Sequence, residues 1–454
     1  MRYIACVRKG DRITLSCSAL DVEGAAVGMH EGVRVHVAGA LPDEQVEVQV
    51  AHVSPHRPDA WGQLESIVTR SRTRVPAVCP GYGRCGGCVI QHLDYEAQLS
   101  WKWERVANQV IGQPILQSVP VGPCVASPRP LGYRNRSKLV YATLDGKHVL
   151  GAYAPRTHAV VDLAGCRVSE PPLDEVAQSL LALLVAHKVP PYDEKLGTGL
   201  LRYAILRVNH LAEVLVTLVT AQRDWPDGAS LASALQSARH EVVGVVQNVN
   251  PTRGNALYGT EDVPLAGRQW LDDKVGPVFV RLSPTAFFQV NRDVATLLYA
   301  DVLAAAALSG TERVVDCYSG VGGVALTLAS RAGEVIGIEE NPSAVEDAVA
   351  SAQLNHARRT RFVCGDAAAK IGELDAADVI VLNPPRRGCD PEVLDAAARL
   401  QPRLILYVSC APDTLVRDLV RLSERGFATR SIRPYDMLPQ TPHVEALAVL
   451  TPAD

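Results

Sequence analysis

The 454-residue sequence lacks a long hydrophobic run and lacks an excess of positive charge. No stretch of about 18 consecutive apolar residues occurs that could span a membrane. Residues 1–9 carry no apolar signal-peptide core. We therefore expect a cytoplasmic protein with no membrane partner. Because 45 Lys and Arg face 49 Asp and Glu, the net charge is −4, which excludes a uniformly basic nucleic-acid binder and leaves only local patches for such contacts.

Two local basic patches are present. One is the stretch Arg70–Arg74, and the other is an acid-free stretch that holds Arg129, Arg134, Arg136 and Lys138. Basic runs are more often solvated faces than binding sites, so each patch alone is a weak signal. Tyr133 lies beside the arginines of the second patch and offers a ring on which a nucleobase could stack.

Cysteine, by contrast, is abundant for a cytoplasmic chain, in which disulfides do not persist. Cys79, Cys85 and Cys88 lie within ten residues among glycines, a pattern specific for a metal or iron–sulfur site. Structural zinc usually takes its ligands as two close pairs, so three close cysteines favour a [4Fe–4S] cluster. The fourth ligand could be Cys124 or Cys166. We favour Cys166 because it lies in a glycine-containing turn.

The pattern of apolar residues predicts a multidomain α/β protein with three parts. Residues 10–69 show short alternating strands separated by glycines, which suits a five-stranded barrel of the oligonucleotide-binding (OB) type. Residues 70–290 mix strand-like and helical stretches and predict an α+β central domain that includes the cysteine motif. Residues 291–454 alternate strands and helices, which predicts a doubly wound, mainly parallel sheet.

Acidic residues end successive predicted strands of the last part. Asp316, Glu339 and Asp366 occupy these positions, and a glycine-rich loop at 317–325 follows the first strand. The loop matches the loose dinucleotide fingerprint, so a nicotinamide cofactor must be considered. An acid at each strand end suits a nucleoside ligand without a pyrophosphate, with Glu339 on the ribose hydroxyls and Asp366 near the adenine. S-adenosylmethionine fits this pattern better than NAD.

Cys410 follows the strand-like run 404–409 and precedes a helical pattern. Ligands bind at the carboxyl ends of strands in open α/β sheets. A thiol at the start of a helix is expected to have a lowered pKa and an exposed thiolate. Taken alone, Cys410 is better explained as a small buried residue, since free cysteine is among the most buried residue types. A second stretch, 438–445, ends in Glu445, and its presence shifts the interpretation of Cys410 toward a functional thiol.

The stretch 282–291 contains two aromatic and two amide residues, at positions that follow neither a helical nor a strand periodicity. These side chains could simply pack, with Asn291 as a helix N-cap. Alternatively, Phe287 could stack on a nucleobase while Gln289 reads its edge.

The chain resembles the RNA 5-methyluridine methyltransferase family in six motifs that occur in the same order. They are the three-cysteine cluster, Phe287–Asn291, Asp316-x-x-x-Gly320-x-Gly322, Asn383-Pro384-Pro385-Arg386-x-Gly388, Val408–Cys410 and His443-x-Glu445. Within residues 10–69, the stretch Gly24–Gly28 and the one from Val35 to Glu44 look like a TRAM domain, which implies an RNA-binding accessory barrel. The branch it resembles is bacterial, contains an iron–sulfur cluster and acts on 23S ribosomal RNA or tRNA.

The resemblance implies a Rossmann-like methyltransferase domain, with S-adenosylmethionine and a [4Fe–4S] cluster as cofactors. Its cluster ligands match Cys79, Cys85, Cys88 and Cys166. Its S-adenosylmethionine contacts match Gln289, Tyr318, Gly320, Glu339 and the residue at 383. Its nucleophile matches Cys410 and its general base matches Glu445. The expected partner is RNA, 23S rRNA before tRNA, and a monomer is the default state.

The implied chemistry is covalent catalysis. C5 of uracil is a weak nucleophile, and addition of the Cys410 thiolate to C6 creates an enolate whose C5 accepts a methyl group. Glu445 would then remove the C5 proton so that the thiolate can leave. The target base must leave its stack, so Phe287 and the basic residues Arg134, Arg136 and Lys138 are expected to hold RNA.

One departure from the family pattern affects the choice of base. The family has aspartate before Pro-Pro-Arg, whereas this chain has Asn383. An amide both donates and accepts, so it could satisfy uracil or, when flipped, cytosine. Methylation of cytosine C5, with Cys389 as a rival nucleophile, is therefore the second hypothesis for the reaction.

Two further functions are compatible with the sequence. A non-catalytic RNA-binding protein with the same fold would bind RNA and S-adenosylmethionine without transferring a methyl group, which a methyl-transfer assay detects. An NAD-dependent enzyme would be recognised by the cofactor that raises its melting temperature.

Overall fold

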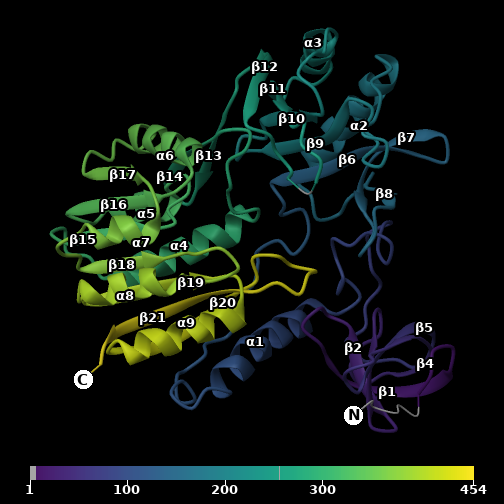
Figure 1. The fold of residues 1–454 in the computed structure, drawn as a ribbon, viewed down its shortest axis with the longest axis horizontal. Coiled ribbons are helices and arrows are strands. Elements are labelled where there is room, and N and C mark those ends of the chain that lie inside the picture. Colours follow the sequence, from purple (N-terminus) through teal and green to yellow (C-terminus); the bar gives the residue numbers. More distant parts are fainter. Residues whose placement is uncertain (1–6, 255, 454) are drawn as a thin grey trace.

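The computed structural model describes residues 7–254 and 256–453, which form a barrel and two large sheets (Figure 1). The barrel closes in the order β1-β2-β3-β5-β4. Its inward positions are filled by alternating valines such as Val33, Val35 and Val37, which are fully buried. The predicted five-stranded barrel is therefore confirmed. Its strands are β1 (Arg12–Leu20), β2 (Ala26–His30), β3 (Val33–Val37), β4 (Gln45–Val53) and β5 (Asp59–Thr69).

The central sheet has seven strands in the order β12-β11-β10-β9-β6-β7-β8. Helices α2 (Pro171–Ala186) and α3 (Gly228–Ala238) bury their leucines against one face of it. Only the β10–β11 pair is parallel within the described part of this sheet, which fits the predicted mixed α+β character. The strands are β6 (Arg136–Leu144), β7 (Lys147–Tyr153), β8 (Val160–Asp162), β9 (Leu201–Val208), β10 (Val214–Thr220), β11 (Val242–Val249) and β12 (Glu261–Gly267).

The carboxy-terminal sheet has seven strands in the order β17-β16-β15-β18-β19-β21-β20. Its first five strands are parallel, and β21 pairs antiparallel with both β19 and β20. The predicted doubly wound sheet is confirmed. The strands are β15 (Arg313–Cys317), β16 (Glu334–Glu339), β17 (Thr360–Cys364), β18 (Val379–Leu382), β19 (Leu404–Ser409), β20 (Phe427–Tyr435) and β21 (Glu445–Pro452).

Helices cover both faces of this sheet. The strand order reverses between β15 and β18, and in open α/β sheets the ligand crevice lies at such a switch point. Parallel strands buried on both faces require nearly continuous apolar runs, and β18 and β19 are buried throughout. The helices are α4 (Arg292–Ala306), α5 (Gly323–Ala329), α6 (Pro342–Leu354), α7 (Ala367–Gly372), α8 (Pro391–Arg399) and α9 (Pro412–Glu424).

Two segments inside the predicted central domain, 70–290, pack with the carboxy-terminal sheet instead. Helix α1 (Tyr95–Ile111) contributes Val106 and Val110 to the core beneath α8 and α9. The hairpin of β13 (Leu271–Val275) and β14 (Val278–Leu282) joins the opposite core beside α4. Figure 1 shows α1 lying alongside α9, far from the central sheet. The carboxy-terminal unit is thus built partly from sequence that precedes residue 291.

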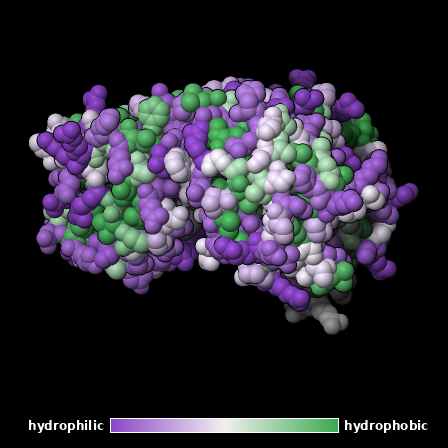
Figure 2. Space-filling model, turned by 90° about the horizontal axis from the view of Figure 1, so that it is seen from above, coloured by the Kyte–Doolittle hydropathy of each residue, from purple (hydrophilic) through white to green (hydrophobic). Residues whose placement is uncertain are grey.

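Hydrophilic side chains cover most of the face seen in Figure 2, and apolar side chains appear there in separate patches. Among the described residues, no helix has both the length and the apolar character needed to cross a membrane.

Candidate active site

Strand pairing brings Cys410 and Glu445 together. Strand β19 ends at Ser409, which lies opposite Ala446 of the antiparallel strand β21. One residue further along β19, Cys410 therefore lies beside Glu445, the first residue of β21. Cys410 is half-buried, and Glu445 is only 7% exposed. A thiol and a carboxyl thus share the carboxyl edge of the sheet.

Burial sets the protonation of both groups. Desolvation raises the pKa of Glu445 to about 7, although the Arg386 guanidinium opposes the rise. A carboxyl with such a pKa can act as a base near neutral pH. Burial and the Glu445 charge also raise the pKa of Cys410, while Arg386 lowers it by charge and hydrogen bonding. The expectation that the start of α9 lowers this pKa was wrong, because desolvation outweighs it.

Arg386 is a charged residue of this candidate site to which the sequence analysis gave no role. Besides Cys410 and Glu445, it meets His443, with Nη2 at 3.4 Å from Nε2. Burial and nearby cations lower the pKa of His443 to about 4, so its imidazole is neutral at neutral pH. Arg386 is therefore a positively charged group beside Cys410 and Glu445. A signal was present, because Arg386 lies in a turn that directly follows a buried strand.

The loop after β15 meets the end of β16. The Gly320 N–H donates a hydrogen bond to Glu339 Oε2 at 3.0 Å, and Asn341 N–H donates to Glu339 Oε1 at 2.9 Å. Tyr318 adopts a left-handed conformation with φ of 63°, which is uncommon for a residue other than glycine. Tyr318, Gly320 and Glu339 are thus gathered at one edge, beside the crevice.

Asp316, the last acidic residue of β15, is 1% exposed, and neither of its carboxylate oxygens meets a hydrogen-bond partner. Burial raises its pKa to about 7. Burying an unpaired polar group is costly, so such a group in a crevice indicates a ligand that donates hydrogen bonds. The sequence marked Asp316 as a strand-end acid but gave no reason to separate it from the other two.

The remaining predicted cofactor contacts are more dispersed. Asn383 directly follows β18 and is half-buried, and its side-chain amide makes no hydrogen bond within the described residues. Gln289 is half-buried, and its main-chain carbonyl accepts a hydrogen bond from Asn135 Nδ2 at 2.9 Å. Asp366 is exposed and caps α7 by accepting from Ala369 N–H at 2.9 Å. Capping accounts structurally for Asp366, whose adenine contact stays a prediction.

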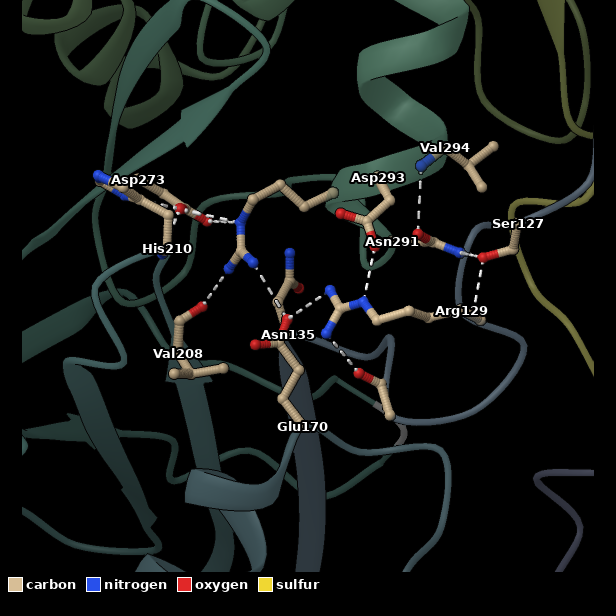
Figure 3. A network of polar contacts seen from close by, with 12 residues as sticks. Ser127, Arg129, Asn135, Glu170, Val208, His210, Asp273, Asn291, Asp293 and Val294 are labelled. Carbon is tan, nitrogen blue, oxygen red and sulfur yellow. Dashed lines mark hydrogen bonds and ion pairs between the residues drawn. The ribbon is translucent and has the colours of Figure 1, made fainter.

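A polar network fixes the stretch 287–291 at the start of α4 (Figure 3). Asn291 Oδ1 accepts from Val294 N–H, as expected for an N-cap, and its Nδ2 donates to Ser127. Arg292 is buried and pairs with Asp273 and Glu170. Asp273 lies on β13, whereas Glu170 precedes α2 beside the central sheet, and Arg292 Nη2 also donates to Val208 O at the end of β9 at 2.9 Å. Arg292 therefore ties the start of α4 both to the β13–β14 hairpin and to the central sheet.

The predicted RNA contacts divide into two groups. Phe287 is 69% exposed, as a stacking residue requires. Arg136 donates to the Tyr258 hydroxyl at 2.8 Å, and Lys138 Nζ lies 4.8 Å from the centre of the Tyr203 ring. Cations and aromatic rings therefore share one face of the central sheet. Arg134 differs, because it is half-buried beside the cysteines and its Nε is buried without a partner.

A cavity of about 290 Å³ is lined by Cys79, Cys85, Cys88 and Cys166, together with Arg134. The Gly87 N–H points at Cys85 Sγ at 3.3 Å. The other candidate ligand, Cys124, lies instead near the buried Asp436. Within residues 7–254 and 256–453, however, no three Cys, His, Asp or Glu side chains are arranged so that they could hold a metal ion. The four cysteines share a cavity without forming a metal centre.

Comparison with known proteins defines the class. Residues 258–452 match the family model described as tRNA (uracil-5-)-methyltransferase. An uncharacterised RNA methyltransferase of Geobacter sulfurreducens is 39% identical over 98% of this chain and 90% of its own length. Another, from Halalkalibacterium halodurans, is 34% identical over 98% of both chains.

A solved structure extends the likeness over the whole fold. The Pyrococcus abyssi tRNA (uracil-54, C5)-methyltransferase, in complex with S-adenosyl-L-homocysteine, is 26% identical, with a TM-score of 0.78, and the match covers 97% of this chain and 100% of that one. The fold is thus that of an RNA methyltransferase. The chain belongs to the RNA (uracil-5-)-methyltransferase family and is an S-adenosylmethionine-dependent enzyme.

Proposed function

We propose that this enzyme methylates C5 of a uridine in RNA, in 23S rRNA before tRNA, with Cys410 as nucleophile and Glu445 as base. The observation that carries the proposal is the pairing of a half-buried thiol and a buried carboxyl across β19 and β21, beside the crevice of the sheet. A carboxyl with a pKa of about 7 suits proton removal near neutral pH.

The chain's own residues then act in two steps. The Cys410 thiolate, favoured by Arg386, forms a bond to C6 of the flipped base, and the electron pair of the C5–C6 double bond moves toward O4. S-adenosylmethionine supplies the methyl group that C5 takes up. Glu445 next takes the C5 proton, the double bond re-forms and the C6–sulfur bond breaks. The neutral imidazole of His443 and the positively charged guanidinium of Arg386 flank the space in which the base reacts.

The residues at the crevice fit S-adenosylmethionine. Asp316 is a buried carboxyl without a partner, as an ammonium group would require. Glu339 stands at the end of β16, where strand-end carboxylates hold ribose hydroxyls in doubly wound folds. We assign Tyr318 and Gly320 as further contacts because they lie at the same edge as Glu339. Asn383 is assigned because it directly follows β18. Gln289 is assigned from the family resemblance alone. Asp366 remains a proposed adenine contact.

The RNA path in this proposal runs over Phe287, Arg136 and Lys138 toward Cys410, and the barrel acts as a TRAM-type RNA-binding module. Support comes from the exposure of Phe287 and from the cation–aromatic pairs on the central sheet. A cytoplasmic location and a monomeric state are part of the same proposal.

The nucleoside product tests the choice of base. We expect the purified enzyme, incubated with labelled S-adenosylmethionine and unmodified rRNA or tRNA, to place the label in 5-methyluridine. Asn383 would then be a tolerated variant of the family aspartate. Label in 5-methylcytidine would contradict the uridine assignment, since a flipped Asn383 amide can also satisfy cytosine. Binding of RNA and cofactor with no transfer would instead indicate a non-catalytic protein.

We further propose that Cys79, Cys85, Cys88 and Cys166 bind a [4Fe–4S] cluster. The support is the composition of the cavity: four thiols line it, the Gly87 N–H is aimed at the Cys85 sulfur, and the half-buried Arg134 supplies a compensating positive charge, although no three of these side chains are arranged as metal ligands among the described residues. No catalytic step uses the cluster. It has a structural or RNA-positioning role.

Anaerobically purified enzyme is expected to be brown and to contain about four irons per chain. Cys166→Ala should lower the iron content, whereas Cys124→Ala, as the matched control, should leave it unchanged. A colourless preparation that contains zinc would contradict the cluster.

A further inference from the structure

The loop 436–444 delivers Glu445 to the site, yet residues from the amino-terminal half of the chain hold it. Its main-chain carbonyls accept hydrogen bonds from donors in residues 89–133. Lys102 Nζ donates to Leu438 O at 3.0 Å, and the Tyr133 hydroxyl donates to Pro439 O at 2.9 Å. Two main-chain N–H groups, those of Val89 and Ile90, donate to Gln440 O at 3.1 and 3.3 Å. Arg105 donates to Pro442 O. The shape of this loop is therefore set from outside the parallel sheet.

The centre of this contact is a pair of amides. Gln98 Nε2 on α1 donates to Gln440 Oε1 at 2.9 Å, and Gln440 N–H donates back to Gln98 Oε1 at 3.0 Å. Gln98 is 1% exposed and Gln440 is 6% exposed. Gln440 has a left-handed φ of 69°. That conformation is unfavourable for glutamine, and the reciprocal pair maintains it together with the hydrogen bonds from Val89 and Ile90 to Gln440 O.

A buried ion pair reinforces the start of the loop. Lys102 on α1 and Asp436 have fully buried side chains and contact one another. Removal of either partner would leave an unpaired buried charge and could unfold the protein. The neutral Gln98 is therefore the better place to test the contact.

We propose that Gln98 and Gln440 are positioning residues for the catalytic base, so that α1 holds Glu445 at the distance from the target base that proton removal requires. The proposal rests on the proposed function, in which Glu445 is that base. It assigns a role in the reaction to a helix that lies outside the methyltransferase sheet. A shift of about 1 Å in a reacting group can cost on the order of 100-fold in rate.

The test separates formation of the Cys410–C6 bond from its release in single-turnover experiments. Gln98→Ala is expected to slow release by about 10- to 100-fold, with S-adenosylmethionine affinity and the rate of adduct formation within about twofold of wild type. Gln440→Asn, which tolerates the left-handed backbone but has a shorter amide, should act in the same way and serves if Gln98→Ala does not fold. Gln109→Ala, an exposed position on the same helix, is the control.

The pH profile of release distinguishes positioning from general destabilisation. Arg386, Cys410 and Tyr299 face Glu445, and His443 faces Arg386. If the loop relaxes, Glu445 gains water and the midpoint of release moves below its wild-type pH. If Gln98→Ala and Gln440→Asn both release the adduct at the wild-type rate and with the wild-type pH midpoint, the proposal is overturned. Failure of the proposed function would appear differently, as no adduct between the wild-type enzyme and 5-fluorouracil RNA.

Discussion

Cys410→Ala is expected to abolish methyl transfer to RNA while binding of S-adenosylmethionine stays nearly unchanged. The thiolate is the only group in the proposed mechanism that activates C5, so its loss should lower turnover by on the order of 10⁴-fold or more. The side chain is small and half-buried, and the crevice residues around Gly320 and Glu339 lie on other strands. Transfer of labelled methyl groups and calorimetric cofactor binding measure the two effects separately.

Two other cysteines serve as controls for this prediction. Cys389, the rival nucleophile, is 3% exposed, and burial raises its pKa to about 12. Cys364 is exposed at the end of β17. Alanine at either position should leave methyl transfer within a few-fold of wild type. Turnover retained by Cys410→Ala and lost by Cys389→Ala would transfer the nucleophile's role to Cys389.

Local patterns predicted the elements of the fold well, but they did not predict which elements pack together. The alternating valines of the barrel and the apolar run at 404–409 each specify a strand, because strand patterns are a local property. Helix α1 and the hairpin β13–β14 are equally recognisable, yet they bury their apolar faces against the carboxy-terminal sheet. Such long-range pairing has no local signal, so a boundary at residue 290 divides a unit that packs as one.

The candidate site shows the same limit. The position of Cys410 at a strand end was predicted, but its pairing with Glu445 depends on the antiparallel return of β21 beside β19. Electrostatics was harder to predict. Helix position suggested a lowered pKa for Cys410, whereas burial and Glu445 raise it, and the opposing effect of Arg386 depends on a proximity to Cys410 that only the fold creates. The Gln98–Gln440 pair joins residues far apart in the chain and leaves no trace in either local pattern.

Glu445→Gln is expected to trap the enzyme on its RNA. The amide cannot accept the C5 proton, so Cys410 should still add to C6 while release slows by about 10²- to 10⁴-fold, the usual contribution of a general base. A protein–RNA adduct that survives denaturation should therefore accumulate, visible as a slowly migrating band on a denaturing gel. Glu340→Gln, at an exposed glutamate near the end of β16, should accumulate none.

The pH dependence of release gives the second half of this prediction. Glu445 acts as a base only when ionised, so with a pKa of about 7 wild-type release should fall tenfold per unit well below pH 7 and level off above it. Adduct formation depends on the Cys410 thiolate, whose pKa is raised, and it should continue to increase through alkaline pH. Release by Glu445→Gln should not depend on pH near 7. If wild-type release also shows no midpoint there, or if the variant forms no adduct, then another group removes the C5 proton.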